Sequence, residues 1–151
     1  MHPRGSPAAA RVVAWYKPGR MAAPQTHLRI DPSLCGAPRR LDDGRAEVTL
    51  ATTAAMAADE QGLVHGGFVF GLADYAAMLA VNHPRVVLGA ATSKFLRPLR
   101  VGDEVVAVAT RTAVTGRKHT VAVEVRRGED AVMTGEFTCL VLDRHVLDPD
   151  T

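Results

Sequence analysis

The sequence predicts an α+β fold in which a curved antiparallel sheet wraps around one long, buried helix. One observation is a segment, residues 68–82, that is rich in Ala, Leu and Met and carries a single charged residue. The other is a set of segments rich in Val and Thr, one before this helix and four after it. A helix with apolar groups on every side must be buried nearly all round. The whole chain has 151 residues, which is enough for one domain with a proper core.

The first predicted strand lies before the helix, at residues 46–53. Its residues Val48, Leu50 and Thr52 alternate with residues of the other face, which is the period of a half-buried strand. A polar turn at residues 59–62 follows. The helix should stop near Pro84, because proline lacks an amide hydrogen and disfavours helical geometry in the residue before it.

Everything after the helix is predicted to be strand. The four strands are expected at residues 86–96, 104–114, 119–126 and 131–142, and turn signals occur at residues 98–103, 115–117 and 127–130. Connections this short predict antiparallel hairpins, and hence a meander. One face of the sheet would cover the helix while the other still carries Val and Leu. Because large exposed apolar patches are unusual on a monomer, we expect at least a dimer.

The first 30 residues differ in charge from the rest of the chain. They hold five basic residues and no acidic one, which leaves 13 basic against 16 acidic residues in the remainder. The excess positive charge therefore does not indicate nucleic-acid binding by the folded domain. Prolines at positions 3, 7, 18 and 24 favour a disordered leader over residues 1–24, with the domain at 25–151. An organelle transit peptide and an extension upstream of Met21 are the alternatives.

Composition excludes several other classes of protein. Apolar residues make up 47% and charged residues 23% of the chain, as in globular proteins. The longest stretch poor in charge, residues 64–81, has Asp74 in its middle and is not expected to span a membrane. Cys35 and Cys139 form no CxxC pair, so neither a disulfide framework nor a metal site is indicated. We expect a cytoplasmic protein with reduced thiols.

The segment that opens the helix has the features of an anion-binding turn. His65, Gly66 and Gly67 stand where unpaired backbone amides and the positive end of the helix dipole favour an oxyanion. Glycine lets a ligand approach this backbone closely.

Asp74 is the second candidate for chemistry. It lies about two turns into an apolar helix, where an unpaired, desolvated carboxylate costs several kcal/mol. A chemical role is one reading. The other is that Asp74 faces a water channel or caps a neighbouring backbone group.

The string HGGFVFGLADYAAM resembles the signature of hotdog-fold acyl-CoA thioesterases of the PaaI type. In that family an HGG turn opens the central helix, and an acid follows nine positions after the histidine. Residues 95–98, FLRP, and 101–103, VGD, resemble the family's later strand-and-turn motif. With the order of the strands, the resemblance covers roughly residues 45–142.

The resemblance implies a hydrolase that cleaves an acyl-CoA thioester into free acid and CoA. The thioester carbonyl would rest against the amide of Gly66 or Gly67, and Asp74 from the partner subunit would act as nucleophile or general base. His65 would polarise the carbonyl or a water, or hold the turn by a side-chain hydrogen bond. The family implies a homodimer, paired into a homotetramer, with CoA as part of the substrate and no other cofactor. Neither nucleic acid nor a membrane is an expected partner.

Asp59 departs from the family pattern. Many relatives have an asparagine six positions before the histidine, where it helps to hold the water. A carboxylate cannot donate as an amide does, and a second acid near Asp74 would raise one of the two pKa values. This departure leaves open a non-catalytic acyl-CoA binding or sensing module. A hotdog dehydratase is disfavoured, because it should carry its histidine in a different motif.

Four cations near loop ends are candidates for contacts with the phosphates of CoA. They are Arg97, Arg100, Arg117 and Lys118. Their ordinary role as solvated surface charge is the alternative for each one.

Deletion of residues 1–20 should leave the melting temperature and the activity unchanged, because the leader lacks any periodicity that could contribute to a core. Thermal denaturation and activity assays of the full chain and the truncated chain measure this. A large loss of either property would show that the leader packs on the domain.

Overall fold

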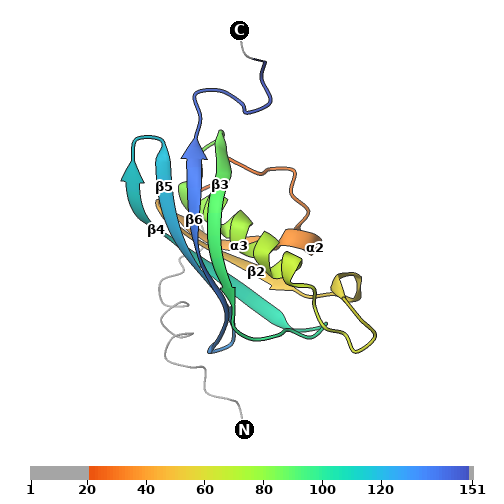
Figure 1. Ribbon diagram of the computed structural model, residues 1–151. Coiled ribbons are helices and arrows are strands. Elements are labelled where there is room, and N and C mark those ends of the chain that lie inside the picture. Colours follow the sequence, from red (N-terminus) through yellow and green to blue (C-terminus); the bar gives the residue numbers. More distant parts are fainter. Residues whose placement is uncertain (1–20, 150–151) are drawn as a thin grey trace.

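The computed structural model describes residues 21–149 of the protein. They form one six-stranded antiparallel sheet in the order β1-β2-β4-β5-β6-β3, together with one long helix, α3 (Figure 1). The elements are α2 (Pro32–Cys35), β1 (Ala37–Asp42), β2 (Arg45–Ala51), a 3-10 turn (Ala54–Met56), α3 (Gly66–Val81), β3 (Val86–Phe95), β4 (Glu104–Thr115), β5 (Lys118–Arg127) and β6 (Asp130–Val141).

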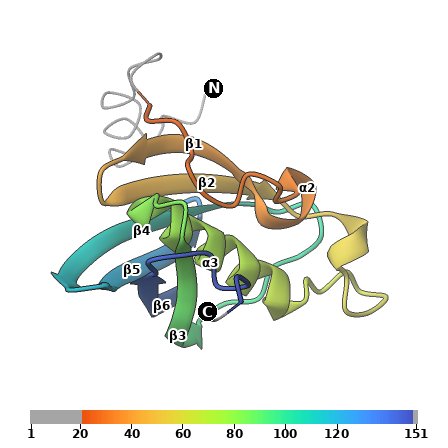
Figure 2. The ribbon, with the colours of Figure 1, turned by 90° about the horizontal axis from the view of Figure 1, so that it is seen from above.

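Helix α3 is the centre of the core. Figure 2 shows that the sheet curves around it, with β1 and β2 on one side of the helix and β3 and β6 on the other. Every residue of α3 from Tyr75 to Val81 is buried. The helix ends where Asn82 takes a left-handed conformation, φ 51° and ψ 48°, and its amide donates to the Met78 carbonyl oxygen. The predicted α+β fold, with one helix inside an antiparallel sheet, is confirmed.

The order of the strands corrects the predicted meander. Strand β3 pairs with β6 and not with β4, so the turn at residues 98–103 does not close a hairpin. This connection pairs instead with the segment before α3: the Val64 amide donates to the Leu99 carbonyl oxygen (2.9 Å), and the Val101 amide donates to that of Gly62 (2.8 Å). Short loops favour hairpins, but here the backbone groups of the connection find their partners elsewhere. Strand β3 therefore lies at an edge of the sheet.

Two elements at the N-terminal side were not predicted. Strand β1 has Pro38 and two arginines among six residues, and only Leu41 is buried, so it shows no alternation of apolar residues. Helix α2 has four residues, too few for any periodicity. It depends on Asp31, whose Oδ1 accepts hydrogen bonds from the amide (2.9 Å) and the hydroxyl (2.7 Å) of Ser33.

The end of the predicted leader makes contacts with the domain. The Ala22 amide donates to the Leu41 carbonyl oxygen (2.9 Å), and Asn82 Nδ2 donates to the Ala23 carbonyl oxygen (3.1 Å). Both alanines fall within the leader that the sequence predicts. Residues 1–20, the rest of it, lie outside the described residues.

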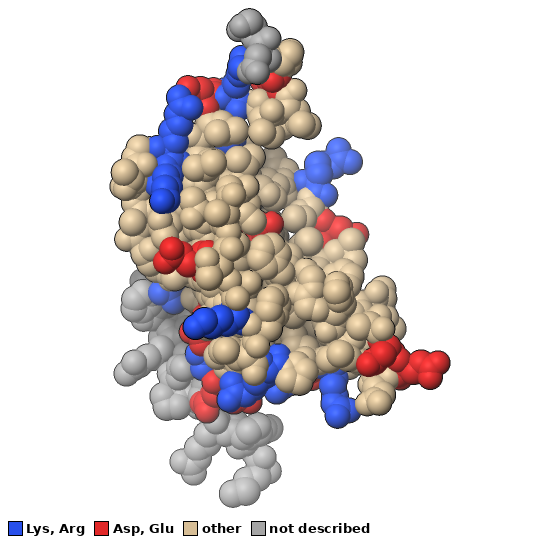
Figure 3. Space-filling view, viewed as in Figure 1, with Lys and Arg blue, Asp and Glu red and all other residues tan. Residues whose placement is uncertain are grey.

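One region of the outer surface of the sheet is poor in charged side chains. Figure 3 shows few charged side chains over the middle of the side on which β3, β5 and β6 lie. Along β3, the four residues 89–92 are exposed and none of them is charged.

Within residues 21–149, no helix combines the length and the apolar character needed to cross a membrane.

The connection between β3 and β4 is fixed by Asp103. Its carboxylate accepts hydrogen bonds from the Arg100 amide (2.8 Å) and from Arg127 Nη1 (3.2 Å). Its carbonyl oxygen accepts one from the Thr52 hydroxyl (2.7 Å). The Arg100 amide, followed by the side chain of Arg127, holds the pKa of Asp103 below its ordinary value, although burial acts in the opposite direction. The VGD motif thus has a structural role.

Asp103→Ala should lower the free energy of unfolding by about 1–2 kcal/mol at pH 7, because it removes two hydrogen bonds to a charged group. The folded-state pKa is lowered, so this stabilisation is complete above an ordinary Asp pKa of about 3.9 and is lost as the pH falls through the folded-state value. Denaturant unfolding of both proteins between pH 7 and pH 3 measures the difference. A difference that stayed constant over this range would contradict the assignment.

Candidate functional site

The N-terminus of α3 presents two backbone amides without acceptors. The Phe68 amide donates to the His65 carbonyl oxygen (3.1 Å), whereas the amides of Gly66 and Gly67 have no hydrogen-bond acceptor among residues 21–149. The approach to the helix is held by the His65 amide, which donates to the Met56 carbonyl oxygen (2.9 Å). Two free donors at a helix N-terminus can stabilise a developing negative charge.

Gly67 has the closer neighbour of the two glycines. A Cβ atom on Gly67 would lie 3.1 Å from Cδ2 and Nε2 of His65, so the imidazole would have to shift. A Cβ atom on Gly66 would lie 3.5 Å from the Phe95 ring, which is an ordinary contact. The turn therefore keeps its backbone open to a ligand.

The His65 ring does not hold the turn as expected. It makes no capping hydrogen bond to the helix, and it packs edge-on to Phe68 with ring centroids 6.2 Å apart. The prediction of a side-chain hydrogen bond across the turn is wrong, because the backbone of His65 already makes both contacts that fix the helix start. The imidazole is exposed beside the free amides.

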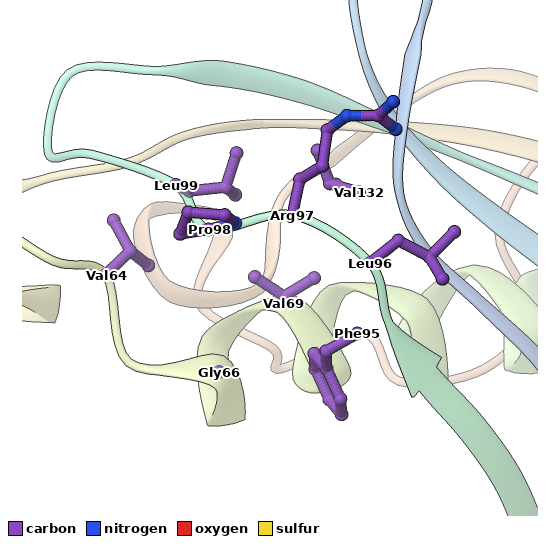
Figure 4. Close-up of a pocket in the computed structure, with 9 residues that line it drawn as sticks. All are labelled: Val64, Gly66, Val69, Phe95, Leu96, Arg97, Pro98, Leu99 and Val132. Atoms are coloured by element: carbon purple, nitrogen blue, oxygen red, sulfur yellow. The ribbon is translucent and has the colours of Figure 1, made fainter.

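An apolar pocket of about 260 Å³ lies next to Gly66 (Figure 4). It is lined by Val64, Gly66, Val69, Phe95, Leu96, Arg97, Pro98, Leu99 and Val132. Figure 4 shows the guanidinium of Arg97 pointing away from Gly66, and its Nη1 donates to the Ala131 carbonyl oxygen (2.8 Å). The FLRP motif thus supplies an apolar wall. No pattern in the sequence indicates Val132, which reaches the pocket only through the pairing of β3 with β6.

Asp74 lies on the one side of α3 that is not buried. Gly67, Gly71 and Asp74 are spaced four and three residues apart, which places them on one face of the helix, and each is at least partly exposed. The Oδ1 atom of Asp74 is nevertheless buried and has no hydrogen-bond partner among the described residues. Burial raises the pKa of Asp74 above its ordinary value. The Asp74 carboxyl group is therefore an ionisable group that is poorly solvated.

Two thiols, those of Cys35 and Cys139, lie near this carboxylate, and the sequence did not predict that either would lie there. A Cβ atom on Gly71 would be 3.9 Å from Cys35 Sγ. Burial and then the charge of Asp74 raise the pKa of Cys35, and the same two causes raise the pKa of Cys139 to about 12. Both thiols are therefore protonated at neutral pH. No spacing in the sequence links either of them to Asp74.

Asp74 and the free amides do not meet within one chain. Asp74 follows Gly66 by eight residues, which corresponds to about 12 Å along the helix axis. Asp74 is also absent from the lining of the pocket. A carbonyl held by the Gly66 amide is therefore beyond the reach of the carboxylate of the same chain.

Asp59 organises the loop before the helix. Its Oδ1 accepts hydrogen bonds from the amides of Gln61 (3.0 Å) and Leu63 (3.1 Å). This is a local turn made by a short acidic side chain. The cause of the raised pKa of Asp74 is burial, so the expected effect of a second acid does not account for it.

The four candidate cations do not gather at one place. Arg97 and Arg100 lie near the apolar pocket, whereas Arg117 lies in the turn between β4 and β5 and Lys118 begins β5. Strand β4 separates the two pairs by roughly 40 Å. Arg117 forms an ion pair with Asp143. Within one chain they cannot all contact one CoA molecule close to the helix N-terminus.

The fold and the sequence match known proteins. The model of the thioesterase superfamily matches residues 61–134. An uncharacterised protein of Pyrococcus horikoshii, PH1136, superposes with a TM-score of 0.84 at 51% identity, over 85% of this chain and 98% of that one. A mutant of the phenylacetic acid degradation protein PaaI of Thermus thermophilus superposes with a TM-score of 0.67 at 32% identity. That match covers 74% of this chain and all of PaaI.

The curated relatives are longer than the segment they share with this chain. A FapR transcription factor of Caldanaerobacter subterraneus is 29% identical over 85 residues, which are 56% of this chain and 42% of FapR. An Aquifex aeolicus protein, 52% identical over 118 residues, is matched over only 26% of its length, so its own activity does not carry over.

The match with PaaI extends over that whole protein, and the single antiparallel sheet with one long buried helix fits the hotdog fold. The chain therefore belongs to the hotdog-fold thioesterase superfamily and is PaaI-like.

Proposed function

We propose that the protein hydrolyses an acyl-CoA thioester to a free acid and CoA. The observation that carries this proposal is the pair of free amides at Gly66 and Gly67 beside an apolar pocket. An acyl group would enter the pocket between Val69 and Phe95, and its carbonyl oxygen would accept a hydrogen bond from one of the amides. Membership of the thioesterase superfamily supports this class of reaction.

The amides would act on the charge that develops during the reaction. When water attacks the thioester carbon, the carbonyl oxygen becomes an oxyanion, and a preorganised N–H donor is typically worth about 3–4 kcal/mol at this stage. The exposed His65 ring lies beside the same turn and would polarise the carbonyl or the attacking water. No metal or further cofactor is required by this scheme.

Asp74 would take the proton of the attacking water as a general base. The water oxygen bonds to the carbonyl carbon, Asp74 receives the proton, and collapse of the tetrahedral intermediate breaks the bond between carbon and sulfur. Proton return to the sulfur releases CoA. In the alternative, the Asp74 carboxylate attacks directly and water cleaves the resulting anhydride. Because burial raises its pKa, Asp74 is a stronger base than an ordinary aspartate.

The carboxylate would come from a partner subunit, because the amides and Asp74 of one chain are too far apart. The exposed face of α3 has Gly67 near one end and Asp74 near the other, with Gly71 between them. A two-fold axis close to Gly71 would place each Asp74 opposite the glycine turn of the other subunit. The small residues on this face would let two helices approach closely.

The two subunits would associate through strand β3. It is an edge strand of ten residues, and an exposed edge presents unpaired backbone groups to another strand. Antiparallel pairing of two β3 strands would continue the sheet across the dimer. Pairing of two such dimers would give the tetramer expected from the family.

An acyl-CoA binding or sensing module is the second candidate. The similarity to FapR favours it, because part of that protein resembles this chain in sequence and its name is that of a transcription factor. In this reading the pocket and the amides hold the ligand, and Asp59 replaces the residue that would position water. The Asp74→Asn experiment separates the two candidates.

Asp74→Asn should lower kcat for acyl-CoA hydrolysis at least about a hundredfold, because it removes the base. Stability should be unchanged or higher: Asp74 Oδ1 makes no hydrogen bond to another described residue, and the substitution removes a desolvated charge. Thiol release and denaturant unfolding measure the two effects. In the wild type, the raised pKa should place the acidic limb of kcat/KM above an ordinary Asp pKa of about 3.9.

Asp59→Asn is the matched control. An amide oxygen can still accept from the amides of Gln61 and Leu63, so the loop should persist. Turnover should rise if the charge at Asp59 hinders the positioning of water. If the wild type binds acyl-CoA tightly without hydrolysing any, the binding module replaces the enzyme.

Light scattering should show a dimer or tetramer at micromolar concentration. Ala91→Glu, near the middle of β3, should weaken association and reduce activity in parallel, because two like charges would meet near the two-fold axis. Ala113→Glu, at an exposed site on β4, is the control and should change neither property. A fully active monomer would contradict the shared site.

A further inference from the structure

A second pocket lies at the opposite end of the sheet from the glycine turn. Its volume is about 610 Å³, within the range of small-molecule sites. It is lined by His83, Pro84, Arg85, Gly116, Arg117, His119, Val141, Leu142 and Asp143. These residues come from the connection between α3 and β3, the turn between β4 and β5, the start of β5, the end of β6 and the two residues that follow β6. In Figure 3, Lys and Arg side chains gather at this end of the molecule.

The charges of the pocket favour an anionic ligand. Arg85 is exposed, and its guanidinium has no hydrogen-bond or ion-pair partner among residues 21–149. Arg117 is paired with Asp143, which is the one carboxylate in the lining. The pocket is therefore positively charged even when both of its histidines are neutral.

The polar groups of the pocket include more donors than acceptors. His83 Nδ1 accepts a hydrogen bond from the Arg85 amide (3.0 Å), so a neutral His83 carries its proton on Nε2. His119 Nδ1 is buried and has no partner among the described residues. The Nε2 donor of a neutral His83 and the exposed guanidinium of Arg85 therefore favour a ligand with oxygen acceptors.

We propose that this pocket binds a phosphate-bearing ligand through Arg85, Arg117 and the two imidazoles. Phosphate presents several acceptor oxygens and pairs with guanidinium in a two-pronged geometry. The volume exceeds that of one phosphate group and leaves room for a diphosphate or for part of a nucleotide. The site depends on residues of one chain, so it stands whether or not the protein hydrolyses thioesters.

The phosphate has two possible sources. One is a free phosphate or nucleotide that binds as a separate ligand. The other is CoA itself, and this source rests on the proposed dimer. Arg85 immediately precedes β3, and Phe95 at the other end of β3 lines the apolar pocket. Antiparallel pairing of two β3 strands would bring the phosphate site of the partner subunit to the acyl pocket of this one.

The test uses the full-length protein and three probes: inorganic phosphate, inorganic pyrophosphate and CoA without an acyl group. Calorimetric titration gives the affinity, and the NMR signals of the imidazoles of His83 and His119 report the location. Arg85→Ala and Arg117→Ala should each weaken pyrophosphate binding at least about tenfold. Asp143→Asn should strengthen it, because it releases Arg117 from its ion pair. Arg29→Ala, an exposed arginine outside the pocket, is the control and should have no effect.

Each outcome decides between the sources or overturns the site. Competition between CoA and pyrophosphate, lost in Arg85→Ala, would identify CoA as the source. Binding of pyrophosphate without such competition would identify a separate ligand. The proposal is overturned if none of the three probes binds. Binding that the Arg85, Arg117 and Asp143 variants leave unchanged, or that shifts neither imidazole, overturns it as well. Hydrolysis is measured separately with the Asp74 variant, so either proposal can fail alone.

Discussion

The burial of α3 is the constraint on which the rest of the structure depends. Every residue from Tyr75 to the end of the helix at Val81 is buried. A single sheet can cover such a helix only by curving around it, and this accounts for the long β4, β5 and β6 strands and for the position of β3 beyond β6. The buried side chains of the sheet, such as Val121, Val123 and Phe137, belong to the same core cluster as the helix. Fold and site share this one element.

The same helix carries both features on which the proposed chemistry depends. At its start, the amides of Gly66 and Gly67 have no acceptors among the described residues, and glycine leaves this backbone accessible. In its middle, the surrounding apolar groups raise the pKa of Asp74. Neither property depends on a side-chain network, because the Asp74 Oδ1 atom has no partner among the described residues and the His65 ring does not cap the helix. A helix that is buried on most sides and exposed along one face can therefore provide both the free amides and the raised pKa.

The sequence predicted what depends on local periodicity and missed what depends on pairing. The helix and the five strands from β2 onward could be located because alternation and apolar density are properties of each segment alone. The pairing of β3 with β6 could not be predicted, since Leu99 and Val101 of the connection to β4 form hydrogen bonds with the segment before α3. Strand β1 has a proline and two arginines, so it lacked the pattern of a strand. In the site, His65, Gly66, Gly67 and Asp74 followed from a contiguous motif. Cys35 and Val132 approach it only through the tertiary fold.

In the proposed reaction, helix geometry would make each chain half of a catalytic site. The rise of an α-helix separates Gly66 from Asp74 by about 12 Å, and no side-chain rotation closes that distance to the roughly 3 Å that a general base needs. An acid placed one turn from the glycines could have served the same carbonyl, but it would have lain beside the free amides and neutralised their effect on an oxyanion. Placing the acid two turns away, on the same exposed face, avoids this. In the proposed dimer, two antiparallel copies would supply two complete sites, each with its amides and its carboxylate on different subunits. Association is thus a requirement of the proposed chemistry, and the uncharged stretch of β3 is consistent with it.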